Sequence, residues 1–379
     1  MIQRAAMPLR VLQVLSQDLV GGAEAIVTLT ARRLAEEGVD SRVATFDAPG
    51  PVVRELAEHG VPVYALGHSR LLAGPRLARL VRSQDFDVVE AYGFKASVIA
   101  RASWPRGARA RLVHCVTGAH LTEVLDFSEA KGRFALVVER LLSRRVAAYD
   151  VISLDAIELL VGHGIDRERM HYIPNGIDLS GWPRRAAPPT ASPPTVLCSA
   201  RFVDRKRQED LIRAAAILAE RSVECRLELP GEGPNLEDAR RLADALGLAG
   251  RTELPGALSA AEVRARLDQA SVFCLPSLWE GQPAAAIEAM AVGVPVVTTD
   301  TPGNREMVDH ERNGLLVPAR DPAALAKAIE RLLTEDGLGE ALASEARRNV
   351  EEHHSLEAMV RRKRELFELL VSTSRHPRG

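Results

Sequence analysis

The chain has 379 residues, of which 46% are hydrophobic and 26% charged, and its formal net charge is −2. These values are ordinary for a globular protein of two or three domains and exclude a wholly disordered chain. A general nucleic-acid binder is usually clearly basic, so the charge gives no support to that class and we expect no nucleic-acid partner.

Short apolar runs alternate with helical patterns along the first half of the chain. Strands are expected at 9–16, 40–46, 61–66, 86–92, 111–117 and 150–154. Helices are expected between them at 25–38, 53–60, 77–84 and 131–147. This alternation predicts a parallel sheet covered by helices on both faces.

A proline-rich segment, PRRAAPPTASPPT, interrupts this pattern, and the alternation then starts again. The predicted organisation is an N-terminal Rossmann-like domain at 1–182, a linker at 183–194 and a C-terminal Rossmann-like domain at 195–355. A helical tail at 356–379 can pack back on the N-terminal domain. The fold class is therefore α/β with two doubly wound domains, and the cleft between them is the expected ligand site.

The four cysteines, Cys115, Cys198, Cys225 and Cys274, show no metal-binding or redox spacing. Three of the four lie in β-like apolar runs. Buried free thiols are the expectation, and they suit a reducing compartment. The N-terminus lacks the apolar core of a signal peptide, and no run of about 20 apolar residues is present. A cytoplasmic protein is expected.

One segment departs from the neutral balance: residues 95–145 hold 10 Lys/Arg and 4 Asp/Glu, a local charge of +6. A solvated face is one interpretation. The other is a peripheral contact with an anionic acceptor or with the inner face of a membrane.

The strongest chemical signal is the segment SLWEGQPAAAIEAMAVGVPVV, at 277–297. A strand ends near its start, and a helix is expected to begin near Pro283. The backbone amides around Gln282, Pro283, Ala284 and Ala285 would then form an anion site at a helix N-terminus. Glu288 lies about one turn into that helix, where its carboxylate can accept hydrogen bonds from ribose hydroxyls.

This segment resembles the signature of glycosyltransferase family 4, whose members have the GT-B fold. The matching positions include Ser277, Glu280, Gly281, Glu288, Gly293 and Pro295. The resemblance implies retaining transfer of a sugar from a UDP- or GDP-sugar donor without a metal or other cofactor. It also implies that Glu280 binds the sugar hydroxyls.

The resemblance extends along most of the chain. Arg201 and Lys206 match two basic residues that contact the donor diphosphate in the family, and Arg205 or Arg207 could share this task. The LPGEGP turn, with Gly231, Glu232 and Gly233, matches a turn at the nucleotide, and Gly21 and Gly22 match a glycine-rich loop after the first strand. Glycines permit the close approach of a backbone to a ligand.

One position departs from the family pattern. Thr117 stands where many members have a histidine, and His120 three residues later is the candidate to replace it. Asp85 and Asp87 have the spacing used by metal-dependent glycosyltransferases, but they precede a strand as in the metal-free family, so no metal is expected.

The acceptor stays open among a glycan, a lipid-linked molecule and a small molecule. Two alternatives to transfer are a non-catalytic nucleotide-sugar-binding protein and an epimerase or hydrolase of the same fold.

Overall fold

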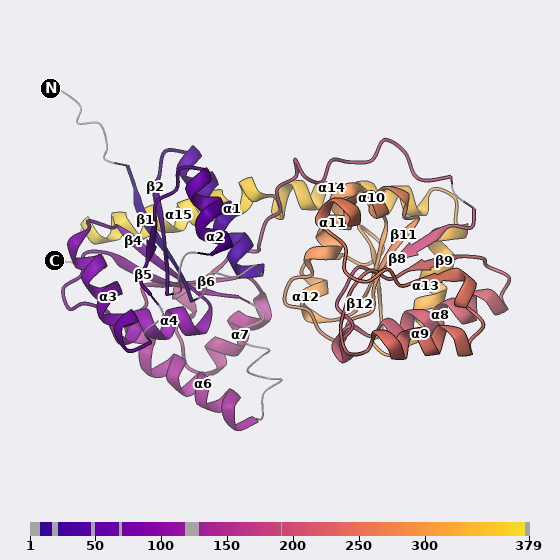
Figure 1. Cartoon of the computed structure of the whole chain (residues 1–379), viewed down its shortest axis with the longest axis horizontal. Helices are drawn as coiled ribbons and strands as arrows, with labels where there is room; N and C mark the ends of the chain where they lie inside the picture. The colour runs from indigo at the N-terminus through magenta and orange to yellow at the C-terminus, as the bar shows by residue number, and fades with distance from the viewer. Residues whose placement is uncertain are drawn as a thin grey trace. The chain divides into compact units, whose positions relative to one another are not determined.

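The computed structural model describes residues 8–16, 22–46, 50–67, 70–117, 129–190 and 192–375. The chain forms two compact units (Figure 1). The first unit contains Met1–Gly176 and Leu356–Gly379, and the second contains Ile177–Ser355. The helical tail thus belongs to the first unit, and the chain passes between the units at Gly176 and again at Ser355.

The first unit contains a parallel sheet with the strand order β3-β2-β1-β4-β5-β6-β7. Its strands are β1 (Arg10–Leu15), β2 (Asp40–Thr45), β3 (Val63–Ala65), β4 (Val88–Tyr92), β5 (Arg111–Val116), β6 (Ala148–Val151) and β7 (Met170–Tyr172). The order reverses direction at β1, which is the arrangement of a doubly wound sheet.

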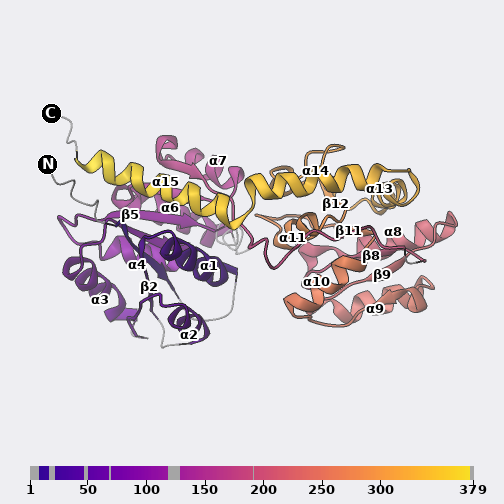
Figure 2. The ribbon, with the colours of Figure 1, turned by 90° about the horizontal axis from the view of Figure 1, so that it is seen from above.

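Helices cover both faces of this sheet. They are α1 (Gly22–Glu36), α2 (Pro51–Glu58), α3 (Arg70–Ser83), α4 (Gly93–Ala102), α6 (Glu129–Leu142), α7 (Leu154–Gly162) and α15 (Leu356–Arg375). Leu12 packs with α3 and α4, whereas its neighbour Val11 packs with α1 and α15. Successive strand residues point to opposite faces, so α15 shares the α1 face, as Figure 2 shows.

A buried lysine fixes α15 to this face. Lys363 is 2% exposed, and its ammonium group lies 2.7 Å from the Glu90 carboxylate on β4 and in contact with Asp150 on β6. Burial alone would lower the pKa of Lys363, but these two carboxylates raise it well above its ordinary value. Gln13 on β1 donates to Glu90 at 3.0 Å, so the network joins three strands to the helix.

The second unit contains a parallel sheet with the order β10-β9-β8-β11-β12-β13. Its strands are β8 (Thr195–Leu197), β9 (Arg226–Glu228), β10 (Thr252–Glu253), β11 (Val272–Leu275), β12 (Val296–Thr299) and β13 (Leu315–Val317). Its helices are α8 (Gln208–Glu220), α9 (Leu236–Ala245), α10 (Ala260–Gln269), α11 (Ala284–Val292), α12 (Pro302–Arg305), α13 (Pro322–Thr334) and α14 (Leu338–His353). Helix α8 packs beside α9 and α13, and α11 packs beside α10 and α14.

Helix α11 is the most apolar helix of this unit. Six of its nine residues are buried, and it ends at Gly293, whose φ of +86° stops the helix. Because α11 is held firmly in the core, the loop that precedes it has a fixed end.

Two parallel α/β units confirm the predicted fold class, with local corrections. The predicted helix at 131–147 ends at Leu142, because Ser143–Arg145 forms one 3-10 turn and β6 begins at Ala148. The helix predicted at 77–84 begins earlier, at Arg70, and contains Pro75. All four cysteines are buried and free, as predicted. Within the described ranges, we find no helix that is both long enough and apolar enough to cross a bilayer.

We predict that Lys363→Met destabilises the protein by about 3–5 kcal/mol, because it leaves two buried carboxylates without their cation. Urea unfolding followed by circular dichroism measures this change. Arg361→Met, at an exposed position of the same helix, is the control and should unfold near the wild-type midpoint. Equal midpoints for the two variants would contradict the role of Lys363.

Candidate functional site

Most of the predicted site residues lie on three segments of the second unit, each following a strand. Arg201 and Lys206 follow β8, Gly231–Gly233 follow β9, and the segment from Glu280 to Glu288 follows β11. These strands are neighbours in the order β9-β8-β11, and all of them are parallel. Their carboxyl ends therefore meet along one edge of the sheet, which is where doubly wound sheets bind ligands.

Two glycines allow the loops after β9 and β8 to run against each other. A Cβ atom on Gly231 would lie 2.0 Å from the Ala200 carbonyl oxygen, and one on Gly233 would lie 2.2 Å from that of Phe202. The Phe202 amide donates to the Glu232 carbonyl at 2.8 Å. Both glycines have φ near +150°, a conformation that side chains disfavour. Glycine is thus required at both positions.

Lys206 and Glu280 form the ionic centre of this edge. The Lys206 ammonium group contacts the Glu280 carboxylate, which is 5% exposed, and Arg205 lies 3.7 Å from the same carboxylate. The Arg205 guanidinium also lies 5.8 Å from the centre of the Trp279 ring. Of the two additional arginines considered in the sequence, Arg205 therefore belongs to the cluster. Arg207 instead pairs with Asp210 at 2.8 Å, at the start of α8.

Arg201 is exposed, and its loop is held in place by Gln208, a residue that sequence reasoning missed. Gln208 is buried at the first position of α8, and its side-chain amide donates to the Arg201 carbonyl at 2.9 Å and to the Ala200 carbonyl at 3.2 Å. The amide thus fixes the backbone that carries Arg201 while the guanidinium stays open to solvent. A glutamine directly after a basic loop gives no recognisable signal in the sequence.

Gly303, in the short helix α12 after β12, is a second residue that sequence reasoning missed. A Cβ atom there would lie 2.1 Å from the Glu280 carbonyl oxygen and 2.7 Å from that of Gly281. Below it, the Asn304 amide donates to the Thr299 carbonyl at 2.8 Å, and the Thr299 hydroxyl donates to the Ser277 carbonyl. The loop that carries Glu280 is therefore supported by the next strand of the sheet.

The start of α11 offers backbone donors beside this centre. Pro283 is its N-cap and provides no side-chain cap. The amides of Ala284 and Ala285, at the first two helical positions, therefore lack an intrahelical acceptor, as helix geometry requires. The Gln282 side chain lies 3.1 Å from the His354 ring, at the end of α14. The helix start is thus suited to an anion or a hydroxyl-rich ligand.

Glu288 lies on the second turn of α11 and is partly buried. Burial raises the pKa of its carboxyl group from 4.5 to about 7. Near neutral pH this group is therefore present in both protonation states, so it can donate as well as accept a hydrogen bond. A carboxyl group with so perturbed a pKa is typical of a ligand site.

In the first unit, fewer of the predicted site residues belong to the described part of the chain. Gly21 and His120 lie outside the described residues, so their predicted roles stay predictions. Gly22 is the first residue of α1, and Thr117 follows β5. His114, which lies within β5, is buried and contacts Glu139 at 3.2 Å.

One cluster of potential metal ligands occurs among the described residues: Glu90, Cys115 and Asp150. The Lys363 ammonium group contacts both of its carboxylates. A cation of the chain itself therefore satisfies this cluster, which is part of the fold of the first unit.

Two family models match the chain. The glycosyl transferases group 1 model matches residues 184–349, and the glycosyl transferase 4-like domain model matches residues 21–176. The putative glycosyltransferase EpsF of Bacillus subtilis is 30% identical over 317 residues, which cover 77% of this chain and 79% of that protein. The chain belongs to the group 1, family 4-like glycosyltransferases.

Another relative is similar over a shorter stretch. A putative colanic acid biosynthesis glycosyltransferase, WcaL of Escherichia coli, is 36% identical over 172 residues. The match spans 44% of this chain and 42% of that relative, less than half the length of either.

The fold is shared with solved structures. Anabaena HepE in complex with UDP superposes with a TM-score of 0.80, over 95% of this chain and 100% of that one, at 20% sequence identity. This similarity confirms the GT-B fold.

We predict that Glu288→Gln stabilises the protein at pH 8 by up to about 3 kcal/mol, and much less at pH 4.5. With a raised pKa in the folded state, the wild type loses stability as the pH rises from about 4.5 to 7, where the unfolded chain ionises first. Thermal unfolding at both pH values measures the difference.

Glu237→Gln, on an exposed face of α9, is the matched control and should not show this pH dependence. A Glu288→Gln variant whose Tm differs from wild type equally at both pH values would show that this pKa is not raised.

Proposed function

We propose that the chain is a retaining, metal-independent glycosyltransferase that transfers a sugar from a UDP- or GDP-sugar to a glycan, lipid-linked or small-molecule acceptor. The observation that carries this proposal is the contact of Lys206 with buried Glu280, beside the glycine loop that supports Arg201. This arrangement places cations, a carboxylate and free helix amides on adjacent loops. Family membership and the fold shared with a UDP-bound protein favour the same function.

Arg201 and Lys206 would stabilise the leaving nucleoside diphosphate. When the bond between the sugar and the diphosphate breaks, negative charge grows on the phosphate oxygens, and preorganised cations lower the energy of that state. Because Lys206 is held by Glu280 before the donor arrives, its ammonium group needs little reorganisation. Arg205, which shares Glu280, can support the same charge.

The two glutamates would recognise the donor. Glu280 accepts hydrogen bonds from the sugar hydroxyls, and Glu288 holds the ribose of the nucleotide. Gly231, Glu232 and Gly233 border the nucleotide. By the resemblance to the family, Gly21 and Gly22 would offer backbone amides to the donor phosphate or the transferred sugar. The backbone N–H groups of Gln282, Ala284 and Ala285 bind sugar and phosphate. The acceptor hydroxyl attacks from the face that the diphosphate leaves, and a diphosphate oxygen takes its proton, so no protein nucleophile is required.

Three parts of this proposal rest on the resemblance to the family: the retaining stereochemistry, the absence of a metal, and a donor nucleotide that is UDP or GDP. We also propose that the protein acts in the cytoplasm, with a peripheral contact to the inner face of the membrane through 95–145, whose local charge is +6. An acceptor carried by a lipid would be presented there. Synthesis of a cell-envelope polysaccharide fits such an acceptor.

The donor is predicted to raise the Tm of the protein in EDTA. Ligand binding to the native state stabilises it by about 2.7 kcal/mol at 100 times Kd. UDP, GDP, ADP and their sugar conjugates are compared by thermal unfolding, and one nucleoside class should stand out. Arg201→Ala should abolish this shift, whereas Arg213→Ala, at an exposed position on α8, should keep it. A folded protein that responds to none of these nucleotides would refute the donor site.

We predict that Lys206→Ala lowers kcat/KM for the donor by about 10²-fold or more, because an electrostatic contact to the leaving group is lost. Donor turnover is measured by release of the nucleoside diphosphate, with a Tm measurement to confirm folding. Lys327→Ala, at an exposed position on α13, should be as active as wild type. Tight donor binding without any turnover in the wild type would instead indicate a non-catalytic binding protein, and an epimerised donor without diphosphate release would indicate an epimerase.

A further inference from the structure

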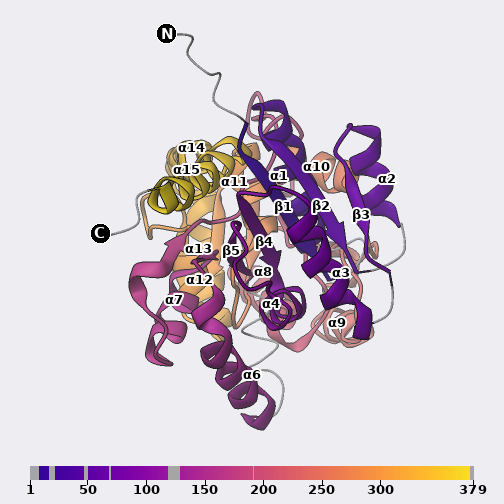
Figure 3. The same ribbon diagram turned by 90° about the vertical axis from the view of Figure 1, so that its left-hand side faces the viewer.

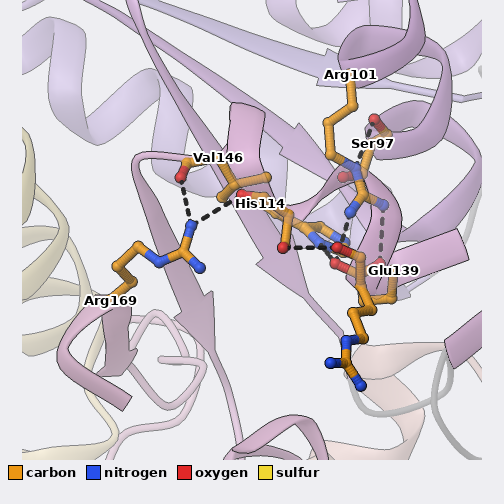
Figure 4. A network of polar contacts seen from close by, with 8 residues as sticks. Ser97, Arg101, His114, Glu139, Val146 and Arg169 are labelled. Carbon is orange, nitrogen blue, oxygen red and sulfur yellow. Dashed lines mark hydrogen bonds and ion pairs between the residues drawn. The ribbon is translucent and has the colours of Figure 1, made fainter. Parts of the chain in front are cut away.

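Helix α6 of the first unit is firmly attached by one face. Glu139, on this inner face, forms a paired contact with the fully buried Arg101 of α4, at 2.6 and 2.8 Å, and a third contact with His114 of β5 (Figure 4). Burial alone would raise the pKa of Glu139, but His114 and Arg101 lower it well below its ordinary value. Helix α6 therefore has one orientation, and its opposite face is directed away from the sheet.

That opposite face is apolar although it is exposed. Phe134 is 69% exposed, Val137 54% and Leu141 71%. Positions spaced three and four residues apart lie on one side of a helix, so these side chains form a single stripe. Figure 3 shows α6 extending away from the sheet and the other helices of its unit. An apolar stripe on a projecting helix marks an interaction surface.

Arginines border the stripe and continue beyond it. Arg140 is exposed beside Leu141, and Arg144 and Arg145 are exposed in the turn that follows the helix. Arg144 and Arg145 also line a cavity of about 420 Å³ together with Arg111, Arg169 and Trp104. None of the described residues that line this cavity is Asp or Glu.

Two of these arginines, Arg145 and Arg169, donate hydrogen bonds to backbone carbonyls. Arg169 donates to the carbonyls of Ser143 and Val146, at 2.8 and 3.2 Å, and Arg145 donates to that of Ala102 at 3.1 Å. Carbonyl oxygens fix a guanidinium group without cancelling its charge. Arg145 and Arg169 are thus held in place by groups that leave their charge intact, which favours anions at the surface that follows the apolar stripe.

We propose that α6 docks on an anionic lipid bilayer, with Phe134, Val137 and Leu141 inserted among the acyl chains and the arginine cavity facing lipid phosphates. This inference rests on the peripheral membrane contact included in the proposed function and assigns it to a specific face. An apolar stripe bordered by arginines is the pattern of a helix that lies in the membrane interface. A second copy of the chain on the same face would bring the two arginine groups together, which charge repulsion disfavours.

Co-sedimentation with lipid vesicles tests this proposal. The full-length protein should bind vesicles of phosphatidylglycerol and phosphatidylcholine and should bind pure phosphatidylcholine much more weakly. Binding should fall strongly in about 0.5 M NaCl, because salt screens charge. Phe134→Ser/Leu141→Ser and Arg140→Glu/Arg144→Glu should each weaken binding by roughly tenfold or more.

Matched controls separate this face from general effects. Leu72→Ser/Leu369→Ser changes two other exposed leucines, and Arg213→Glu/Arg361→Glu changes the same amount of charge at exposed positions elsewhere. Both controls should bind vesicles as the wild type does. All variants should keep the nucleotide-induced Tm shift, so a failure of docking is distinguishable from a failure of the donor site.

Two results would overturn the proposal. One is wild-type protein that stays in the supernatant with anionic vesicles at low salt. The other is a Phe134→Ser/Leu141→Ser variant that binds as well as wild type. Concentration-dependent dimers in light scattering that these serine substitutions dissociate, without vesicle binding, would instead assign the stripe to a second copy.

Discussion

The close approach of two loop backbones is the constraint on which the candidate site depends. Gly231 and Gly233 lie where any Cβ atom would collide with the carbonyls of Ala200 and Phe202. Because the two loops can touch, the chain after β8 has a defined course toward β11, where Lys206 meets Glu280. Gly303 makes a similar approach on the other side, against the Glu280 carbonyl. Backbone packing thus fixes the loops that carry the charged side chains. The position of these groups therefore depends less on the flexibility of the side chains themselves.

The first unit is organised by a different interaction, a buried charge. Lys363 brings its ammonium group from the last helix of the chain to carboxylates on β4 and β6. An apolar side chain would also fill this space, but only a cation satisfies both carboxylates. The network therefore specifies one position of α15 on the sheet. Met359 and Phe367 add apolar burial around the lysine, but apolar contacts discriminate less between alternative positions of the helix.

The sequence predicts the fold well because its signals are local. Alternating strands and helices give two parallel sheets, and the 277–297 motif identifies the loop and helix that carry Glu280 and Glu288. The supporting residues are not predictable in this way. Gln208 and Gly303 act through backbone carbonyls that are distant or unremarkable in sequence, so only the folded chain reveals their partners.

Helix α6 shows a second reason why sequence reasoning stops. Its segment FALVVERLL is apolar on several sides, so the pattern does not say which side faces the sheet. The Arg101–Glu139 contact decides this, and it joins residues that are 38 positions apart. Once Glu139 is directed inward, Phe134 and Leu141 must face outward. A helix whose sequence pattern leaves its orientation open therefore presents an apolar surface.

The two glutamates of the candidate site illustrate how environment divides one residue type into two chemical roles. A carboxylate near a diphosphate repels it unless its charge is compensated. Glu280 is compensated by Lys206 and Arg205, which remain available to a second anion because each has further N–H donors. Glu288 is compensated differently, since burial raises its pKa to about 7 and a proton neutralises it over much of the time near neutral pH. Both carboxyl groups can therefore lie beside the proposed donor, one as an ion-paired acceptor and the other as a group that donates or accepts as the ribose hydroxyls require.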